Sequence, residues 1–95
     1  MFELDATTVI AQGSRTASRV VSGAAVVVVI DTQELHTLNE VGTRVWQLAE
    51  RRPLGEIAKA ISEEFEVTYE TALDDVRAFT ETLLSGGMVD VVASP

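Results

Sequence analysis

The hydrophobic residues in the first part of this chain follow a strand pattern. Residues 24–30 form an unbroken apolar run in which five of seven residues are valine or isoleucine, and β-branched side chains suit the pleated surface of a sheet. Residues 15–21 and 34–38 flank this run across the short turns 22–23 and 31–33. Because two short turns connect three consecutive strands, the pattern predicts an antiparallel meander.

The second part of the chain changes to helical spacing. Residues 40–50, 54–65 and 68–85 each place apolar side chains three or four positions apart, which gives a helix one hydrophobic face. Asn39 and Thr68 stand where the first and third of these segments begin, and their side-chain oxygens can accept a hydrogen bond from a free backbone N–H group. The spacing therefore predicts three short helices after the sheet.

The expected helix ends carry residues that suit them. Arg51 and Arg52 follow the first helix, where positive charge favours the negative end of the helix dipole. Pro53 suits the first turn of the second helix, because no backbone N–H donor is needed there. Gly86 or Gly87 can take the left-handed conformation that ends the third helix.

The faces of the sheet and the ends of the chain complete the expected fold. The run 24–30 does not alternate, so we expect both faces of the middle strand to be covered, one by the helices and the other by the N-terminal segment or by a second copy in a homodimer. Residues 1–14 are expected to form an N-terminal extension that packs on a domain of residues 15–92, with residues 88–92 as a final strand or tail. The predicted fold class is α+β, with a three-stranded antiparallel sheet followed by three helices in a winged-helix-like arrangement.

Composition and charge limit the classes of function. A chain of 95 residues is long enough for one domain with a modest core. It has no cysteine, which excludes disulfides, thiolate catalysis and cysteine-bound zinc. Neither a secretory signal nor an apolar run long enough to cross a bilayer is present, so the expected location is the cytoplasm, with no membrane partner.

The balance of charge argues against nucleic acid as a partner. Seven Lys and Arg against fifteen Asp and Glu give a net charge of −8. In a winged-helix protein that binds DNA, the third helix would enter the major groove, yet residues 68–85 carry four acidic residues and only one base, Arg77. Phosphates would repel such a helix. DNA binding therefore ranks below peptide binding, and a purely structural dimerisation module is the other alternative.

No arrangement of residues in the chain predicts catalysis. His36 is the only histidine, so a half-buried strand residue is a better interpretation than a metal ligand. Asp74 and Asp75 point in different directions on a helix, which favours a solvated acidic face over a cation site. Trp46 falls at helical spacing with apolar neighbours and is expected in the core. The sequence predicts a binding protein without enzymatic activity, cofactor or metal.

Several short motifs together resemble the PqqD family. Leu38 and Asn39 end the third expected strand, and Gly42 and Trp46 follow in the first helix. The second and third helices and the Gly-Gly-Met-Val sequence after them continue the similarity, which spans residues 20–91. Proteins of this family look like a three-stranded sheet followed by three helices. They serve as recognition elements for ribosomally synthesised and post-translationally modified peptides.

The resemblance implies a peptide chaperone that holds the leader of a precursor peptide while another enzyme modifies it. That enzyme is often a radical SAM protein, although cyclases and proteases also occur, and the pathway can be that of pyrroloquinoline quinone or of another peptide product. The leader adds a strand to the edge of strand three and lies in a groove against helix three. The implied peptide-binding residues are Glu34, Leu35, His36, Thr37 and Leu38 on the edge, and Ala72, Asp75, Val76 and Phe79 on the helix.

Overall fold

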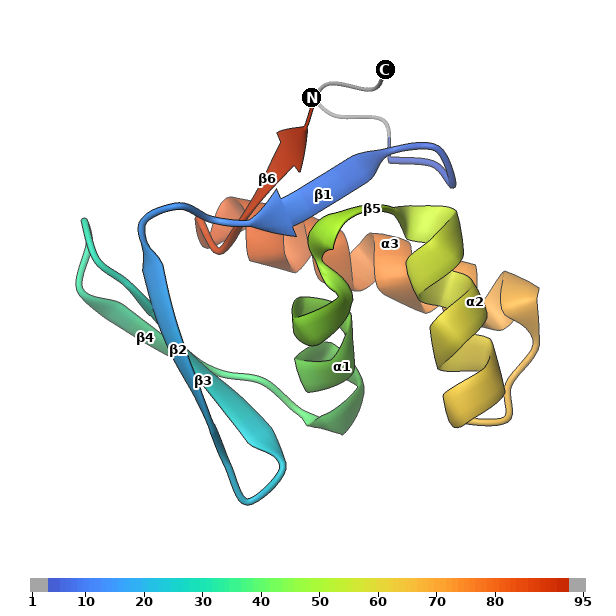
Figure 1. Cartoon of the computed structure of the whole chain (residues 1–95), viewed down its shortest axis with the longest axis horizontal. Helices are drawn as coiled ribbons and strands as arrows, with labels where there is room; N and C mark the ends of the chain where they lie inside the picture. Colours follow the sequence, from blue (N-terminus) through green and yellow to red (C-terminus); the bar gives the residue numbers. More distant parts are fainter. Residues whose placement is uncertain (1–3, 93–95) are drawn as a thin grey trace.

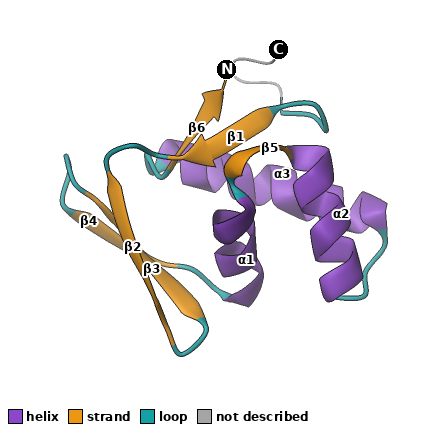
Figure 2. Cartoon of the chain, viewed as in Figure 1, coloured by secondary structure: helices purple, strands orange, loops and turns teal. Residues whose placement is uncertain are grey.

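The computed structural model describes residues 4–92, and its strands form two separate sheets (Figure 2). One is an antiparallel sheet in the order β2-β3-β4, and the other has the order β5-β1-β6. Within the described residues, three helices pack between and beside these sheets (Figure 1). The α+β class and the meander are confirmed, whereas the second sheet was not predicted. The elements are β1 (Val9–Gln12), β2 (Thr16–Val21), β3 (Ala24–Val29), β4 (Glu34–Thr37), α1 (Glu40–Leu48), β5 (Glu50–Pro53), α2 (Leu54–Glu64), α3 (Tyr69–Ser85) and β6 (Val89–Val92).

The β2-β3-β4 sheet is the predicted meander. Ser22 and Gly23 connect β2 to β3, and both have a positive φ, which is the pattern of the two-residue type I′ turn. Along β3, the side chains of Ala25, Val27 and Val29 are buried against the helices. One face of the sheet therefore forms part of the core.

Among residues 4–92, the opposite face of this sheet stays open. Val26 and Val28 on β3 are half-buried, and beside them Val21 and Leu35 are 52% and 63% exposed. The N-terminal segment was one of the two expected covers. For its described part this expectation is wrong, because β1 pairs with β5 and β6 in the other sheet, and residues 1–3 lie outside the described residues. Only the second expected cover, another copy of the protein, is left as a prediction.

The β5-β1-β6 sheet joins the two ends of the described chain. β1 is its central strand and pairs antiparallel with both neighbours. The expected final strand is confirmed as β6. The first predicted helix was too long, because α1 ends at Leu48 and Glu50–Pro53 forms β5. Arg51 and Arg52 therefore belong to a strand, and Pro53 caps α2 instead of lying in its first turn.

The predicted helix caps are confirmed. Asn39 and Thr68 accept hydrogen bonds from backbone N–H groups three residues further on, at 2.7 and 3.2 Å. At the end of α3, Gly87 has a φ of +74°, and the N–H groups of Gly87 and Met88 bond back to the last turn at 3.1 and 2.8 Å. This pair of bonds is the Schellman motif, in which a glycine ends the helix without steric cost.

The core confirms the prediction for Trp46, whose side chain is only 2% exposed.

A polar contact fixes α1 to the sheet beside it. The Ala25 N–H donates to Thr43 Oγ1 at 2.8 Å, and that hydroxyl donates to the Leu38 carbonyl at 3.3 Å. Since these groups are buried, the two bonds remove the cost of leaving them unpaired. The start of α1 is therefore held in place next to β4.

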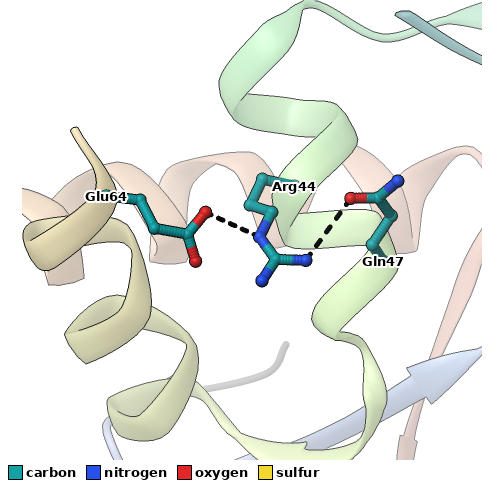
Figure 3. Close-up of polar contacts among 3 residues, drawn as sticks. All are labelled: Arg44, Gln47 and Glu64. Atoms are coloured by element: carbon teal, nitrogen blue, oxygen red, sulfur yellow. Dashed lines mark hydrogen bonds and ion pairs between the residues drawn. The ribbon is translucent and has the colours of Figure 1, made fainter. Parts of the chain in front are cut away.

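A second polar contact joins α1 to α2 at the surface. Arg44 Nε lies 2.7 Å from Glu64 Oε1 and its Nη1 donates to Gln47 Oε1 at 3.4 Å (Figure 3). The hydrogen bond to Glu64 raises the pKa of Arg44. Because both side chains are more than a third exposed, at 37% and 41%, this pair contributes about 1 kcal/mol or less to the free energy of unfolding.

No helix within residues 4–92 is both long and apolar enough to span a bilayer.

Candidate functional site

The free edge of β4 presents unpaired backbone groups. β4 pairs with β3 on one side and lies at the edge of its sheet. The Leu38 N–H donates to the Ala25 carbonyl at 2.8 Å, so residue 38 and alternate residues along β4 direct their backbone groups toward β3. Since backbone direction alternates along an antiparallel strand, Leu35 and Thr37 direct their N–H and C=O groups outward, away from the sheet.

The inner face of β4 is turned toward α3. His36 pairs with Val27, whose side chain is in the core, and cross-strand partners share a face of the sheet. A β-carbon built on Gly86, at the end of α3, would lie 3.6 Å from His36 Cε1. His36 is half-buried, as expected for a strand residue at this position. Its Nε2 has no hydrogen-bond partner among residues 4–92. The same residues contain no group of three or more His, Cys, Asp or Glu that could hold a metal.

A groove of about 380 Å³ lies between the start of α1 and α3. The ring of Phe79 forms part of it and packs directly on the backbone of α1, because a β-carbon built on Gly42 would lie 2.1 Å from Phe79 Cζ. The residues that line the groove are Asn39, Val41, Asp75, Ala78, Phe79 and Thr82.

The structure divides the predicted helix residues into two sets. Asp75 and Phe79 line the groove, and their role in binding a peptide stays a prediction. Ala72 and Val76 have no exposed surface and belong to the core, so the prediction that they form the groove wall is wrong. Both lie on the face of α3 that packs inside the domain, and the groove lies along the neighbouring face.

The missed residues on α3 follow a simple helical spacing. Ala78 and Thr82 lie three and seven positions after Asp75, and Phe79 lies four positions after it. Positions with this spacing share one side of a helix, so the spacing from Asp75 could have identified Ala78 and Thr82. Asn39 and Val41 come from α1, and no local signal connects them with α3.

Four of the five edge residues of the predicted site lie on one strand. Glu34, Leu35, His36 and Thr37 form β4 itself. Leu38 lies just beyond the strand and is 6% exposed, with its side chain in the core. Its backbone and packing therefore position the strand, while its side chain has little surface to offer a ligand.

The groove carries negative charge beside its aromatic ring. Asp75 is exposed, and no ion pair among the described residues involves it. The only base on α3, Arg77, lies 3.9 Å from Asp74. A free strand edge, an apolar groove and an unpaired carboxylate thus lie near one another. This arrangement suits an extended peptide chain better than the phosphate backbone of a nucleic acid.

Two solved structures are similar to this chain over most of its length. The structure of TbiB1 in complex with the TbiA(beta) leader peptide has 26% sequence identity and a TM-score of 0.80, and the similarity covers 88% of this chain and 99% of that one. Lasso peptide synthetase B1 complexed with the leader peptide has 20% identity and a TM-score of 0.75, with 85% and 96% covered, which shows a common fold.

Sequence comparison defines the family. No curated protein sequence matches the chain significantly. The sequence model of the family described as coenzyme PQQ synthesis protein D (PqqD) matches residues 24–89. This range runs from the first residue of β3 to the first residue of β6 and thus contains β4, all three helices and the groove. Because the match covers well over half of the chain, the protein belongs to the PqqD family.

Proposed function

We propose that this protein binds the leader of a ribosomally made precursor peptide as an added strand on β4 and presents it to an enzyme that modifies the peptide. The observation that carries the proposal is the free edge of β4, where the backbone groups of Leu35 and Thr37 point outward beside the groove of α1 and α3. Family membership and the similarity to TbiB1, which was solved with a leader peptide, support it.

The backbone would provide most of the affinity. An antiparallel leader strand exchanges hydrogen bonds with Leu35 and Thr37, because their N–H and C=O groups face the open edge. The leader residue opposite His36 then directs its side chain to the same face as His36, toward α3. Leader residues two positions apart share that face, so alternate side chains of the leader reach the groove.

The groove would provide selectivity. Phe79, Val41 and Ala78 offer apolar surface to one anchoring side chain of the leader. Asp75 adds a carboxylate without an ion-pair partner among the described residues, which favours a Lys or Arg beside the anchor. The net charge of −8 also attracts cationic peptides, as the Asp75 carboxylate does.

A separate partner enzyme modifies the bound precursor peptide. In this proposal the chain is a chaperone that holds the substrate, and the chemistry belongs to a separate protein such as a radical SAM enzyme, a cyclase or a protease. The encounter takes place in the cytoplasm, where the precursor peptide is made. The pathway is that of pyrroloquinoline quinone or of another modified peptide.

Calorimetric titration with leader peptides of precursors encoded beside the gene tests the proposal. Thr37→Pro removes one outward N–H donor without removing a bond to β3. Losing one backbone hydrogen bond, with its partner on the leader left unpaired, should weaken binding about tenfold. Circular dichroism shows whether the variant stays folded.

The other edge of the same sheet provides a matched control. The Ile30 N–H donates to the Arg15 carbonyl at 2.9 Å, so alternate residues of β2 face β3 while the N–H of Ser18 points to solvent. Ser18→Pro makes the same change on the opposite edge of the sheet, at a residue that does not line the groove, and should leave leader affinity unchanged. Equal affinity of the folded Thr37→Pro variant and the wild type would refute strand addition to β4.

A further inference from the structure

We infer that Gly42 is a positioning residue of the groove, because its lack of a side chain lets the Phe79 ring lie against α1 and so sets how large a leader side chain the groove accepts. The inference rests on the proposed function, since it concerns the selectivity of the same site. It assigns a role to a buried residue that does not line the groove.

The contact between Gly42 and Phe79 is too close for any side chain at position 42. A β-carbon built on Gly42 would lie 2.1, 2.7 and 2.9 Å from Cζ, Cε2 and Cε1 of Phe79. Carbon atoms in contact are normally about 3.6 Å apart, so the ring would have to move by roughly 1.5 Å to admit an alanine. Three ring atoms are involved, and a small rotation of the ring does not relieve all three contacts.

The ring can retreat in one direction only. The Gly42 N–H donates to Asn39 Oδ1 at 2.7 Å in the cap of α1, which holds this backbone in place. On α3, the neighbouring residues Val76 and Thr80 are fully buried and leave no space inside the domain. The open side of the ring is the groove, so a side chain at position 42 drives the ring into it.

This geometry predicts a change in selectivity instead of a general loss of binding. Gly42→Ala fills part of the groove with the displaced ring, so leaders with a bulky anchor lose affinity and leaders with a small anchor keep it. Phe79→Leu should compensate, because leucine ends at its δ-carbons and lacks all three of the ring atoms that approach position 42. The double variant should therefore recover the wild-type preference, and Phe79→Leu alone should accept larger anchors.

A first measurement needs no peptide. With ¹³C-labelled phenylalanine, the ring signals of Phe79 are identified by their loss in Phe79→Leu. Gly42→Ala should shift these signals. Gly55→Ala makes the same substitution in the first turn of α2, where a β-carbon meets no atom closer than 3.1 Å, and should leave them unchanged. Unshifted Phe79 signals in Gly42→Ala would overturn the inference.

A second measurement selects peptides directly. A displayed library of random 12-residue peptides is panned against the wild type, Gly42→Ala, the double variant and Thr37→Pro. The wild type and the double variant should enrich bulky apolar residues at one shared position, and Gly42→Ala should enrich alanine or valine there and bind the bulky peptides at least tenfold more weakly. If wild type and Gly42→Ala enrich the same residues with the same affinities, the inference about Gly42 is overturned, and the proposed function still stands.

The remaining outcomes are also decisive. If the wild type enriches no more peptide than Thr37→Pro does, the proposed function fails and the selectivity inference falls with it. If Gly42→Ala does not fold, the double variant is compared with Phe79→Leu, in which position 42 keeps its glycine. The inference expects smaller anchors for the double variant, and identical anchor sizes would contradict it.

Discussion

Replacing Trp46 by alanine should remove a large share of the stability of this protein. The side chain is 2% exposed and lies on α1 within the core. A tryptophan buries about 150–250 Å², which at about 25 cal/mol per Å² corresponds to roughly 4–6 kcal/mol. Alanine keeps the β-carbon and the surrounding side chains relax only in part, so we expect a loss of about 3–5 kcal/mol. The total free energy of unfolding of a domain of this size is about 5–15 kcal/mol.

Urea denaturation followed by circular dichroism measures this loss, because the variant lacks the fluorescent residue. Tyr69→Ala is the matched control, since Tyr69 is 44% exposed and its truncation should cost less than about 1 kcal/mol. The backbone of Trp46 is unaffected by the change and keeps the bond from Gln12 Nε2 to its carbonyl at 2.8 Å. A loss no larger than that of the control, or a wild-type emission maximum typical of a solvated tryptophan, would refute the reasoning.

Three further results are expected. Deleting residues 1–14 removes β1, the central strand between β5 and β6, and should lower the melting temperature sharply; an unchanged melting curve would show that this sheet contributes nothing. Glu64→Gln breaks the ion pair with Arg44 and should cost about 1 kcal/mol or less, with a smaller cost at high salt, in urea denaturation; a cost above 2 kcal/mol contradicts the surface character of the pair. The open face of the β2-β3-β4 sheet predicts a homodimer in sedimentation that Val21→Glu weakens, and a wild type that stays monomeric at high concentration would exclude it.

Local signals in the sequence were sufficient for the meander, the helices and their caps. Asn39, Thr68 and Gly87 act on backbone groups within a few residues, so their roles can be inferred from neighbours in the chain. The same holds for the Ser22-Gly23 turn between two β-rich segments. The core position of Trp46 follows from helical spacing, because a large apolar side chain on the apolar side of a helix must be covered.

The second sheet depended on contacts between distant parts of the chain. The sequence of β5, Glu-Arg-Arg-Pro, has no strand pattern, and it looks like the end of a helix followed by a cap. It becomes a strand because β1, about 40 residues earlier, offers backbone partners such as Ile10 for Arg52. Tertiary pairing of this kind overrides local preference, and no window of sequence around β5 contains the information.

The site shows the same division. The family resemblance indicates Glu34–Thr37, which form β4, and Asp75 and Phe79, which line the groove. It also indicates Ala72 and Val76, which the structure buries in the core. Spacing along a helix defines which residues share a face, whereas the packing of α3 against the other elements decides which face is buried. Gly42 and Phe79 are 37 positions apart in sequence. Their contact joins α1 to α3. Only the folded chain, in which the two backbones are held at a fixed distance, decides that this glycine positions the ring.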